Sequence, residues 1–432
     1  MRDGRLAPHG PSFKALVLNN ASQVTRQSFA DISRLADSGL PIVIVGQPIP
    51  YPSSDAIDSN ALSAGVNALL TKPNVRRASV GTVASVLADL GIAPSVTVRS
   101  QGLWYTSWRD SDSDKSSTLF VLGDTKATAG EIELETKDTP FMLDAWTGLI
   151  RPVLNYRRSS DGKKLIVPLR LAGNETAFIG LFDDLHKNVE LPKVHVSKLP
   201  DTVIDLTSSD RSGIIANVVA NRNVGLENAQ ILLSSQRAID ITRTIARTPP
   251  AMELKSWTLL MEHWEAPADL YDADVVAIKR NSTREVTAPL LGWSAINGLQ
   301  NASGIASYST SFTWPPKSSY GSSLGAYLKL PPLLHTAKLL VNGKEARAVN
   351  VMNPVVDISP QLIAGTNQIT IVIPSTMWNY LRSMLGDLVS SGGPPFRVTS
   401  LNISFPVPPR TENGLIGTVV LTPYSTLRLE LA

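Results

Sequence analysis

The stretch GLPIVIVGQP, Gly39–Pro48, determines the fold at the start of the chain. At its centre, Ile42–Val45 is a run of four β-branched apolar residues, which is typical of a parallel strand buried on both faces. Before it, apolar residues recur at three- and four-residue spacing from Phe29 to Ala36, and Gly39 stands where a left-handed residue ends a helix. The stretch therefore predicts a helix followed by a central strand.

The same alternation continues on both sides of this strand. A short apolar run at Ala15–Leu18 predicts a strand, Asp55–Leu70 predicts a helix, and Arg76–Val80 predicts a third strand. Apolar spacing that ends at Gly91 predicts one more helix. Strands that alternate with helices form parallel sheets, so we expect residues 1–96 to be a small α/β domain, although three strands are few for a doubly wound fold.

The pattern changes to period two after Pro94. Apolar and polar residues then alternate in short stretches bounded by Gly, Asp and Ser, and Asp161–Gly162 is a strong hairpin turn. We expect an antiparallel β-sandwich over residues 97–250. Its most regular predicted strands are Val96–Ser100, Leu103–Arg109, Thr118–Gly123, Gly130–Thr136 and Lys164–Leu171.

The region from Met252 onward also has the pattern of β-strands, but other residues interrupt them. Prolines interrupt it repeatedly, which helices do not tolerate. Asn342–Gly343 predicts a second hairpin turn, and Asn367–Ile373 alternates cleanly between polar and apolar residues. We therefore expect residues 251–432 to form a jelly-roll sandwich.

The composition excludes several classes of protein. The 432 residues carry 40 Lys and Arg against 37 Asp and Glu, and a net charge of +3 is too small to indicate a nucleic-acid-binding chain. Cysteine is absent, so there is no disulfide framework, no thiolate metal site and no cysteine nucleophile. No stretch approaches the roughly 18 consecutive apolar residues of a membrane span. We therefore expect neither nucleic acid nor a membrane as a partner.

Five Asn-x-Ser/Thr sequons favour a secretory route, because such sites receive glycans only there. The first residues, Met1–Gly10, contain charged side chains and no long apolar run, so they are not expected to be a signal peptide. We therefore expect an extracellular protein whose front end, with the export signal, precedes this sequence. The predicted glycosylation sites are Asn20, Asn174, Asn281, Asn301 and Asn402.

Two long stretches of the predicted sandwiches carry a family pattern. In the first, WYTSWRDSDSDKSSTLFVLGD at Trp104–Asp124 is followed by LDAWTGLIRPVLNYRRSSDGKKLIVPLRLAGNETAFIGLF at Leu143–Phe182. In the second, GWSAINGLQNASGIASYSTSFTWP at Gly292–Pro315 precedes LLVNGKEA at Leu339–Ala346 and DISPQLIAGTNQITIVIPSTMWNYL at Asp357–Leu381. These stretches resemble glycoside hydrolase family 106, the α-L-rhamnosidases.

The resemblance covers nearly the whole chain, in the family's order. The first part, with GRLAPHGPSFKALVL at Gly4–Leu18, is similar to the glutamine-amidotransferase-like, flavodoxin-like domain that follows the family's catalytic barrel. The last part is similar to the galactose-binding-like jelly roll shared with family 2 hydrolases. In the family, the catalytic carboxylates and a calcium site lie in the (β/α)8 barrel that comes first. Nothing here matches that barrel, so we expect no catalytic residue, no metal ligand and no cofactor in this chain.

The resemblance implies an accessory, carbohydrate-associated portion of a secreted, fungal-type α-L-rhamnosidase-like glycoside hydrolase, without activity on its own. Its partner would be a plant or microbial polysaccharide or a rhamnoside. The alternative is a free-standing secreted carbohydrate-binding or scaffold protein. The genomic sequence upstream of Met1 separates the two, because an in-frame barrel with a signal peptide supports the first and a promoter supports the second.

Three residues are the best sequence-based candidates for sugar contact. Trp378 and Asn379 lie in the predicted loop after Asn367–Ile373, and Asn342 lies in the hairpin expected to face that loop. An aromatic ring suits the apolar C–H face of a pyranose, and amides hydrogen-bond to hydroxyls. The alternative is that Trp378 packs in the core and that both amides stabilise turns.

One match to a serine-hydrolase elbow occurs at Gly321–Gly325, with His335 nearby in sequence. The elbow must join a strand to a helix, so that the serine rises above the sheet. Here a strand is predicted to follow, at Ala326–Leu330, so Ser323 is not expected to be a nucleophile.

Overall fold

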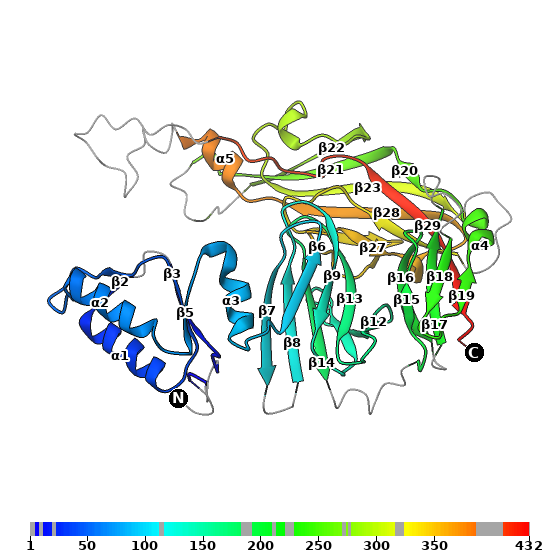
Figure 1. Cartoon of the computed structure of the whole chain (residues 1–432). Helices are drawn as coiled ribbons and strands as arrows, with labels where there is room; N and C mark the ends of the chain where they lie inside the picture. Colours follow the sequence, from blue (N-terminus) through cyan, green and yellow to red (C-terminus); the bar gives the residue numbers. More distant parts are fainter. Residues whose placement is uncertain are drawn as a thin grey trace. The chain divides into compact units, whose positions relative to one another are not determined.

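The computed structural model is mainly β, with several antiparallel sheets and a few short helices (Figure 1). It divides into two compact units, Met1–Ser95 and Val96–Ala432. In the part of the chain that the structure describes, no helix is both long enough and apolar enough to span a membrane. The described residues are 5–7, 12–19, 23–111, 116–182, 192–209, 213–220, 229–269, 274, 278–315, 324–385 and 409–431.

The first unit contains a parallel three-stranded sheet in the order β1-β3-β5, with helices packed on both faces. Strands and helices alternate as the sequence predicts, whereas the amidotransferase-like or flavodoxin-like kind stays a prediction. A shorter parallel pair joins β2 to β4. The elements are β1 (Leu16–Leu18), β2 (Gln23–Val24), α1 (Arg26–Asp37), β3 (Ile42–Val45), β4 (Ile49–Pro50), α2 (Ser59–Leu69), β5 (Val75–Ala78) and α3 (Val83–Asp89).

The alternation of side chains along β3 explains why helices cover both faces of this sheet. Ile42 and Ile44 belong to the apolar cluster that includes residues of α1 and α2. Val43 and Val45 belong to a second cluster with the apolar side of α3. All four side chains are buried. After α1, Gly39 has a φ of +87°, the left-handed conformation predicted for the residue that ends this helix.

The second unit begins with a sandwich of two antiparallel sheets. One has the order β11-β10-β14-β8-β7 and the other the order β12-β13-β9-β6. Apolar side chains on the facing surfaces, among them Leu119, Ile132 and Val167, form one buried core. The strands are β6 (Val96–Ser100), β7 (Tyr105–Ser111), β8 (Ser116–Leu122), β9 (Thr128–Leu134), β10 (Pro140–Leu143), β11 (Ile150–Pro152), β12 (Arg157–Arg158), β13 (Leu165–Leu171) and β14 (Thr176–Phe182).

The predicted hairpin turn at Asp161–Gly162 joins two strands of this sandwich. Gly162 has a φ of +70°, and its N–H donates to the carbonyl oxygen of Ser159 at 2.9 Å. The turn connects β12 to β13, which pair antiparallel. The hairpin prediction is therefore confirmed.

One sheet crosses the boundary expected near residue 250. The strand β17, which also pairs with β16, pairs with the strand nearest the C-terminus, so that Ile214 lies opposite Leu429. The apolar side chains of β17 also share a cluster with Leu429, so this region shares both a sheet and a core with the end of the chain. The elements are β15 (Val196–Lys198), β16 (Val203–Ser209), β17 (Gly213–Val219), β18 (Gln230–Leu233), β19 (Ala238–Asp240), α4 (Thr242–Arg247) and β29 (Val419–Leu429).

The rest of the second unit packs two large antiparallel sheets against each other. One has the order β16-β17-β29-β24-β27, with β20 also paired to β29, and the other has the order β22-β21-β23-β28-β25-β26. Its jelly-roll, galactose-binding-like connectivity stays a prediction. The remaining elements are β20 (Met252–Leu254), β21 (Ser256–Glu265), β22 (Ile278–Thr287), β23 (Gly304–Trp314), β24 (Leu324–Lys329), β25 (Lys338–Val341), β26 (Lys344–Glu345), β27 (Val355–Asp357), β28 (Gly365–Pro374) and α5 (Trp378–Ser383).

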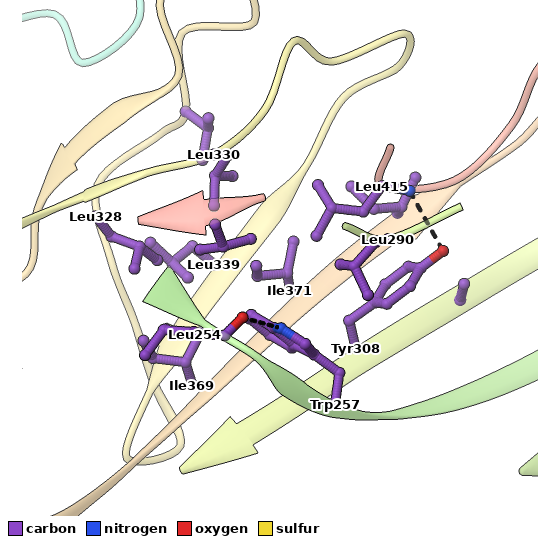
Figure 2. Close-up of a cluster of buried hydrophobic side chains, with 14 of the residues drawn as sticks. Leu254, Trp257, Leu290, Tyr308, Leu328, Leu330, Leu339, Ile369, Ile371 and Leu415 are labelled. Atoms are coloured by element: carbon purple, nitrogen blue, oxygen red, sulfur yellow. Dashed lines mark hydrogen bonds between the residues drawn. The ribbon is translucent and has the colours of Figure 1, made fainter. Parts of the chain in front are cut away.

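The core between these two sheets combines apolar packing with paired polar groups (Figure 2). The indole N–H of Trp257 donates to the carbonyl oxygen of Leu254 at 2.8 Å. The buried hydroxyl of Tyr308 accepts from the indole N–H of Trp293 at 2.8 Å and from the backbone N–H of Leu415 at 3.3 Å. Because these donors are paired, the core carries aromatic residues without the cost of an unpaired polar atom.

Candidate functional site

A cleft of about 540 Å³ opens beside the outer face of the sheet that contains β29. One wall is formed by strands β16, β17, β24 and β27, and the other by β10 and by the ends of β13 and β14 in the first sandwich. The loop at 347–353 closes one side. All of these residues belong to the second unit. Pockets of this size suit small ligands, so we take the cleft as the candidate site.

The alternation of side chains in the sheet places polar residues in the cleft. Ala326 and Leu328 of β24 point into the core, so Tyr327 between them points outward. The same alternation turns Asn217 of β17 outward, between two buried apolar neighbours. Asp205 of β16 and Asp357 of β27 line the cleft as well. Four strands therefore each contribute one polar side chain to one surface.

The first polar group of the cleft centres on Tyr327. Its hydroxyl accepts from the Nδ2 group of Asn217 at 2.8 Å and lies 3.4 Å from Oδ2 of Asp205, to which it can donate. The guanidinium of Arg151 approaches the same carboxylate oxygen at 3.7 Å. Asn217 is 6% exposed and Tyr327 is 9% exposed, so only Asp205 and Arg151 offer substantial surface to a ligand.

The second polar group centres on Asp357. Its carboxylate accepts from the hydroxyl of Ser359 at 2.6 Å and from the hydroxyl of Tyr424 at 3.2 and 3.3 Å. The rings of Tyr327 and Tyr424 pack with their centroids 4.8 Å apart, which joins the two groups. Gly325 permits this arrangement, because an added Cβ would lie 2.2 Å from Cζ of Tyr424.

Three ionisable groups in and beside the cleft have raised pKa values. Loss of water around its carboxyl group raises the pKa of Asp205; the charge of Asp357 raises it further, while Arg151 opposes the shift. The side chain is nevertheless 35% exposed, because the walls surround it without covering it. Burial raises the pKa of Tyr424 to about 12 and also raises the pKa of Tyr327. Both tyrosines are therefore neutral donors at pH 7.

The rim of the cleft presents an aromatic side chain. Trp146 is 41% exposed and lies in the turn Asp144–Gly148. The Asp144 carboxylate accepts from the backbone N–H of Trp146 at 2.9 Å and from the hydroxyl of Thr147 at 2.6 Å, and Gly148 has a φ of +71°. These bonds fix the turn, so the indole is held at the rim by a structured loop.

A buried carboxylate joins the two walls of the cleft. Glu175, at the start of β14, is 8% exposed and accepts from the backbone N–H of Ala172 at 2.7 Å. It also accepts from the side-chain amides of Asn350 and Asn353, each at 3.1 Å. The first sandwich is thereby bonded to the 347–353 loop, which keeps the width of the cleft defined.

The cleft combines the groups that recognise sugars. Neutral hydroxyls and an amide donate and accept hydrogen bonds, a carboxylate and a guanidinium bind hydroxyls more strongly, and an exposed indole suits the C–H face of a ring. In the described part of the chain, no cluster of three or more His, Asp or Glu side chains is placed to hold a metal ion.

The three sugar-contact candidates from the sequence do not come together. The side chain of Asn342 contacts Gln368 near the start of β28, whereas Trp378 and Asn379 follow its end. At about 3.3 Å per residue, these positions are roughly 20 Å apart along the strand. The expectation that Asn342 faces the loop of Trp378 is therefore wrong, because the hairpin and α5 lie at opposite ends of β28.

Both candidate amides are engaged in structural hydrogen bonds. Asn342 has a φ of +52°, and its amide donates to the carbonyl oxygen of Gln361 at 2.9 Å and accepts from the N–H of Gln368 at 2.9 Å. Asn379 is buried and binds both the N–H and the carbonyl oxygen of Thr411. Trp378 is half-buried, and its indole N–H donates to the carbonyl oxygen of Pro409 at 3.2 Å. Its role in sugar contact stays a prediction.

The predicted glycosylation sites differ in accessibility. Asn174 lies at an exposed turn with a φ of +58°, and Asn281 is exposed on β22. Asn301 is half-buried, and its side-chain oxygen accepts from Arg410 at 3.1 Å. Asn20 and Asn402 lie outside the described residues.

The serine-hydrolase elbow does not have its required geometry. Ser323 lies outside the described residues, and the next residue, Leu324, begins strand β24 and not a helix. Nε2 of His335 lies 2.8 Å from Oδ1 of Asn413, a structural contact within the same unit. The prediction that no helix follows the motif is confirmed.

Comparison with known proteins gives a structural likeness only. No protein-family model matches the chain, and no curated protein matches it in sequence. A rhamnosidase from Novosphingobium sp. PP1Y is similar to 97% of this chain and 34% of its own length, with a TM-score of 0.55 and 19% identity. The chain therefore spans about a third of that enzyme and shares its fold over this part.

Other glycosidases, one of them of family 2, give weaker matches. A β-galacturonidase from Eisenbergiella tayi matches 40% of this chain and 24% of its own length at 16% identity and a TM-score of 0.24. A β-glycosidase from Bacteroides vulgatus matches 40% of this chain and 20% of its own length at the same identity and TM-score. These TM-scores are too low to carry an argument.

Proposed function

We propose that this chain is the accessory, carbohydrate-associated portion of an α-L-rhamnosidase-like glycoside hydrolase, and that the cleft around Tyr327 binds a saccharide. The observation that carries the proposal is the convergence of Asp205, Asn217, Tyr327 and Asp357 in one cleft with Trp146 exposed at its rim. The likeness to part of a rhamnosidase supports the glycosidase context. Plant or microbial polysaccharides and rhamnosides are the ligand class.

The chain is proposed to lack activity of its own. Glycoside cleavage needs a protonated carboxyl at the leaving oxygen and a second carboxylate on the other side of the bond. In family 106, which the sequence resembles, both come from a barrel that nothing here matches. Burial raises the pKa of the Asp205 carboxyl, which is the direction that an acid catalyst needs, so Asp205 is the residue to change as a control.

A free-standing carbohydrate-binding or scaffold protein is the alternative, and the cleft suits it equally. Secretion and glycosylation are part of the proposal in both cases, supported by the exposed sequons at Asn174 and Asn281. The genomic sequence upstream of Met1 distinguishes an enzyme portion from a free-standing protein.

Calorimetric titration of the purified chain with L-rhamnose and neutral rhamnose-containing oligosaccharides tests the cleft. We expect weak binding that Arg151→Gln and Asp205→Asn reduce, while Lys338→Gln, on β25 outside the cleft, leaves it unchanged. Unaltered binding in both cleft variants would refute the site. We expect no turnover of an aryl α-L-rhamnoside; turnover that Asp205→Asn abolishes would instead place an active site in this chain.

A further inference from the structure

A second and larger groove lies next to the cleft, in the same unit. Its volume is about 1210 Å³, and it runs between the outer face of the β12-β13-β9-β6 sheet and the residues of β15 and β16. Arg170 and Ile204 line both the groove and the cleft, so the two hollows meet at these side chains. The volume of the groove exceeds the roughly 300–1,000 Å³ of pockets for drug-sized ligands, so it has room for more than one sugar unit.

The lining of the groove is strongly cationic. Its charged side chains are Arg99, Arg157, Arg158, Arg170 and Lys198, against Glu131 as the one carboxylate among the described lining residues. This contrasts with the whole chain, in which 40 basic residues nearly balance 37 acidic ones. The side chains that line this groove are therefore more basic than the chain as a whole.

Three of the five cations have acidic partners. Arg157 binds Glu131 through two bonds of 2.5 and 2.6 Å. Arg99 lies 3.4 Å from Glu133, which also binds Lys164. Arg170 pairs with Asp201, and both side chains are more than half exposed, so the pair is weak and can exchange partners.

The other two cations lack a carboxylate in the described part of the chain. Arg158 donates to the carbonyl oxygens of Thr136, Lys137 and Asp138, which orient the guanidinium without neutralising its charge. Lys198 is exposed. Arg158 pairs in register with the buried Leu165, so its side chain leaves the core-side face of the sheet. Lys198 is therefore the cation available to an anion, and Arg170 can supply a second.

The remaining lining suits a sugar and not a bare ion. Pro168 and Ile204, which is 44% exposed, offer apolar surface for C–H faces. Pro168 is tolerated in β13 because β12 pairs only with Leu165 and Ile166, which leaves the strand an edge beyond them.

We propose that this groove binds an acidic oligosaccharide, with uronic acid carboxylates at Lys198 and Arg170. The proposal rests on the proposed function for the class of ligand, and it specifies the charge and the site. Carboxylates bind guanidinium and ammonium groups through charge-assisted hydrogen bonds, which neutral sugars cannot form. A chain longer than the groove would extend past Arg170 into the cleft.

The test compares two ligands of equal length, tetragalacturonate and its methyl ester, by calorimetric titration of the full chain. We expect the acid to bind about tenfold more tightly than the ester at 50 mM NaCl, with the difference shrinking at 500 mM as salt screens the charges. The double variant Lys198→Gln/Arg170→Gln should remove most of that difference. Lys338→Gln, a lysine paired with Glu345 on another sheet, should not change it.

The outcomes separate this proposal from the proposed function. Equal binding of acid and ester would overturn the acidic ligand while leaving the saccharide cleft intact. Binding of the acid alone supports the groove, and binding of neither overturns the groove. The cleft is judged separately by the titrations with L-rhamnose and neutral rhamnose-containing oligosaccharides. If a single-stranded oligonucleotide of equal charge binds more tightly than tetragalacturonate, the groove is a general polyanion site and the proposal fails. Circular dichroism of each variant confirms that its fold is retained.

Discussion

The hydroxyl of Tyr327 lies 3.4 Å from Oδ2 of Asp205, although the two residues are 122 positions apart in the chain. Their strands, β24 and β16, belong to one sheet but are not adjacent, since β17 and β29 lie between them. The contact therefore depends on the whole sheet being assembled. Because Asp205 faces a cleft and has a raised pKa, its protonation reports on that assembly.

Asp205→Asn should alter how stability depends on pH. The folded protein holds the Asp205 proton above its ordinary pKa of 3.8, where the unfolded chain has lost it. The linkage relation then gives a contribution that is lost as pH rises through the raised pKa. Scanning calorimetry from pH 4 to 7 should show that the variant loses less stability, or gains more, than the original protein over this range.

Asp240→Asn is the matched control for that measurement. Hydrogen bonds from the side chain and the backbone of Thr242 lower the pKa of Asp240, so its contribution has the opposite sign and is lost as pH falls. If both variants shift the pH profile in the same direction, the assignment of Asp205 is wrong.

His195 should remain neutral well below the pH at which histidine normally titrates. Burial, with a smaller effect of the Arg158 charge, lowers its pKa to about 4, and its ring stacks on Tyr156 with centroids 3.8 Å apart. The unfolded chain binds this proton near pH 6.5, so stability falls as pH drops from about 6.5 towards 4. The His195 ring signal, assigned by His195→Gln, should not shift in NMR spectra between pH 7 and 5; a midpoint near 6.5 would contradict the buried position.

Gly414→Ala should destabilise the second unit strongly. Gly414 has a φ of +104°, and an added Cβ would lie 2.6 Å from the indole of Trp293 and 2.9 Å from the hydroxyl of Tyr308. Strain and overpacking together should cost about 2–4 kcal/mol, measured by urea unfolding. Gly343→Ala is the control, because φ is +75° there but nothing lies within 4 Å, so only the strain should appear. Equal losses would show that the packing around Trp293 is not tight.

Trp146→Ala should weaken saccharide binding more than Trp378→Ala does. Trp146 is 41% exposed at the cleft, whereas the indole of Trp378 is half-buried and bonded to Pro409. Titration of both variants with the same neutral oligosaccharide measures the difference. If Trp378→Ala loses more affinity than Trp146→Ala, the saccharide site lies instead at the loop after β28, as the sequence suggests.

Glycan occupancy should follow the exposure of the sequons. In a fungal host that secretes the protein, peptide mapping should find Asn174 and Asn281 modified, and Asn301 modified less because its side chain is half-buried and bonded to Arg410. If Asn174 and Asn301 are both bare, the secretory assignment loses its local support.

The local elements were largely predictable from the sequence. The run Ile42–Val45 predicts a strand covered on both faces, and the structure divides its side chains between two apolar clusters. The turn Asp161–Gly162 needs only its own residues to form a hairpin. In both cases the determinants are local in sequence, so a pattern is sufficient.

The candidate site was not predictable, because it depends on how distant strands pair. Alternation shows that Tyr327 and Asn217 point outward, but their contact arises only because β29 pairs with both β17 and β24. The sequence favoured Trp378, Asn379 and Asn342 on chemical type alone. Backbone groups 19 to 32 positions away in the chain instead engage the two amides.

The pairing of β17 with β29 can form only when synthesis of the chain is nearly complete. Residues 213–219 leave the ribosome roughly 210 residues before their partners at 424–429, which at about 5–20 residues per second is a delay of about 10–40 s. Throughout that interval, the strand with Ile214, Ala216 and Val218 can pair with β16 along one edge, while its other edge lacks β29. An unpaired apolar strand edge is a template for aggregation. The yield of folded protein should therefore depend on the chaperone capacity of the host. It should rise when the host produces the protein at low temperature.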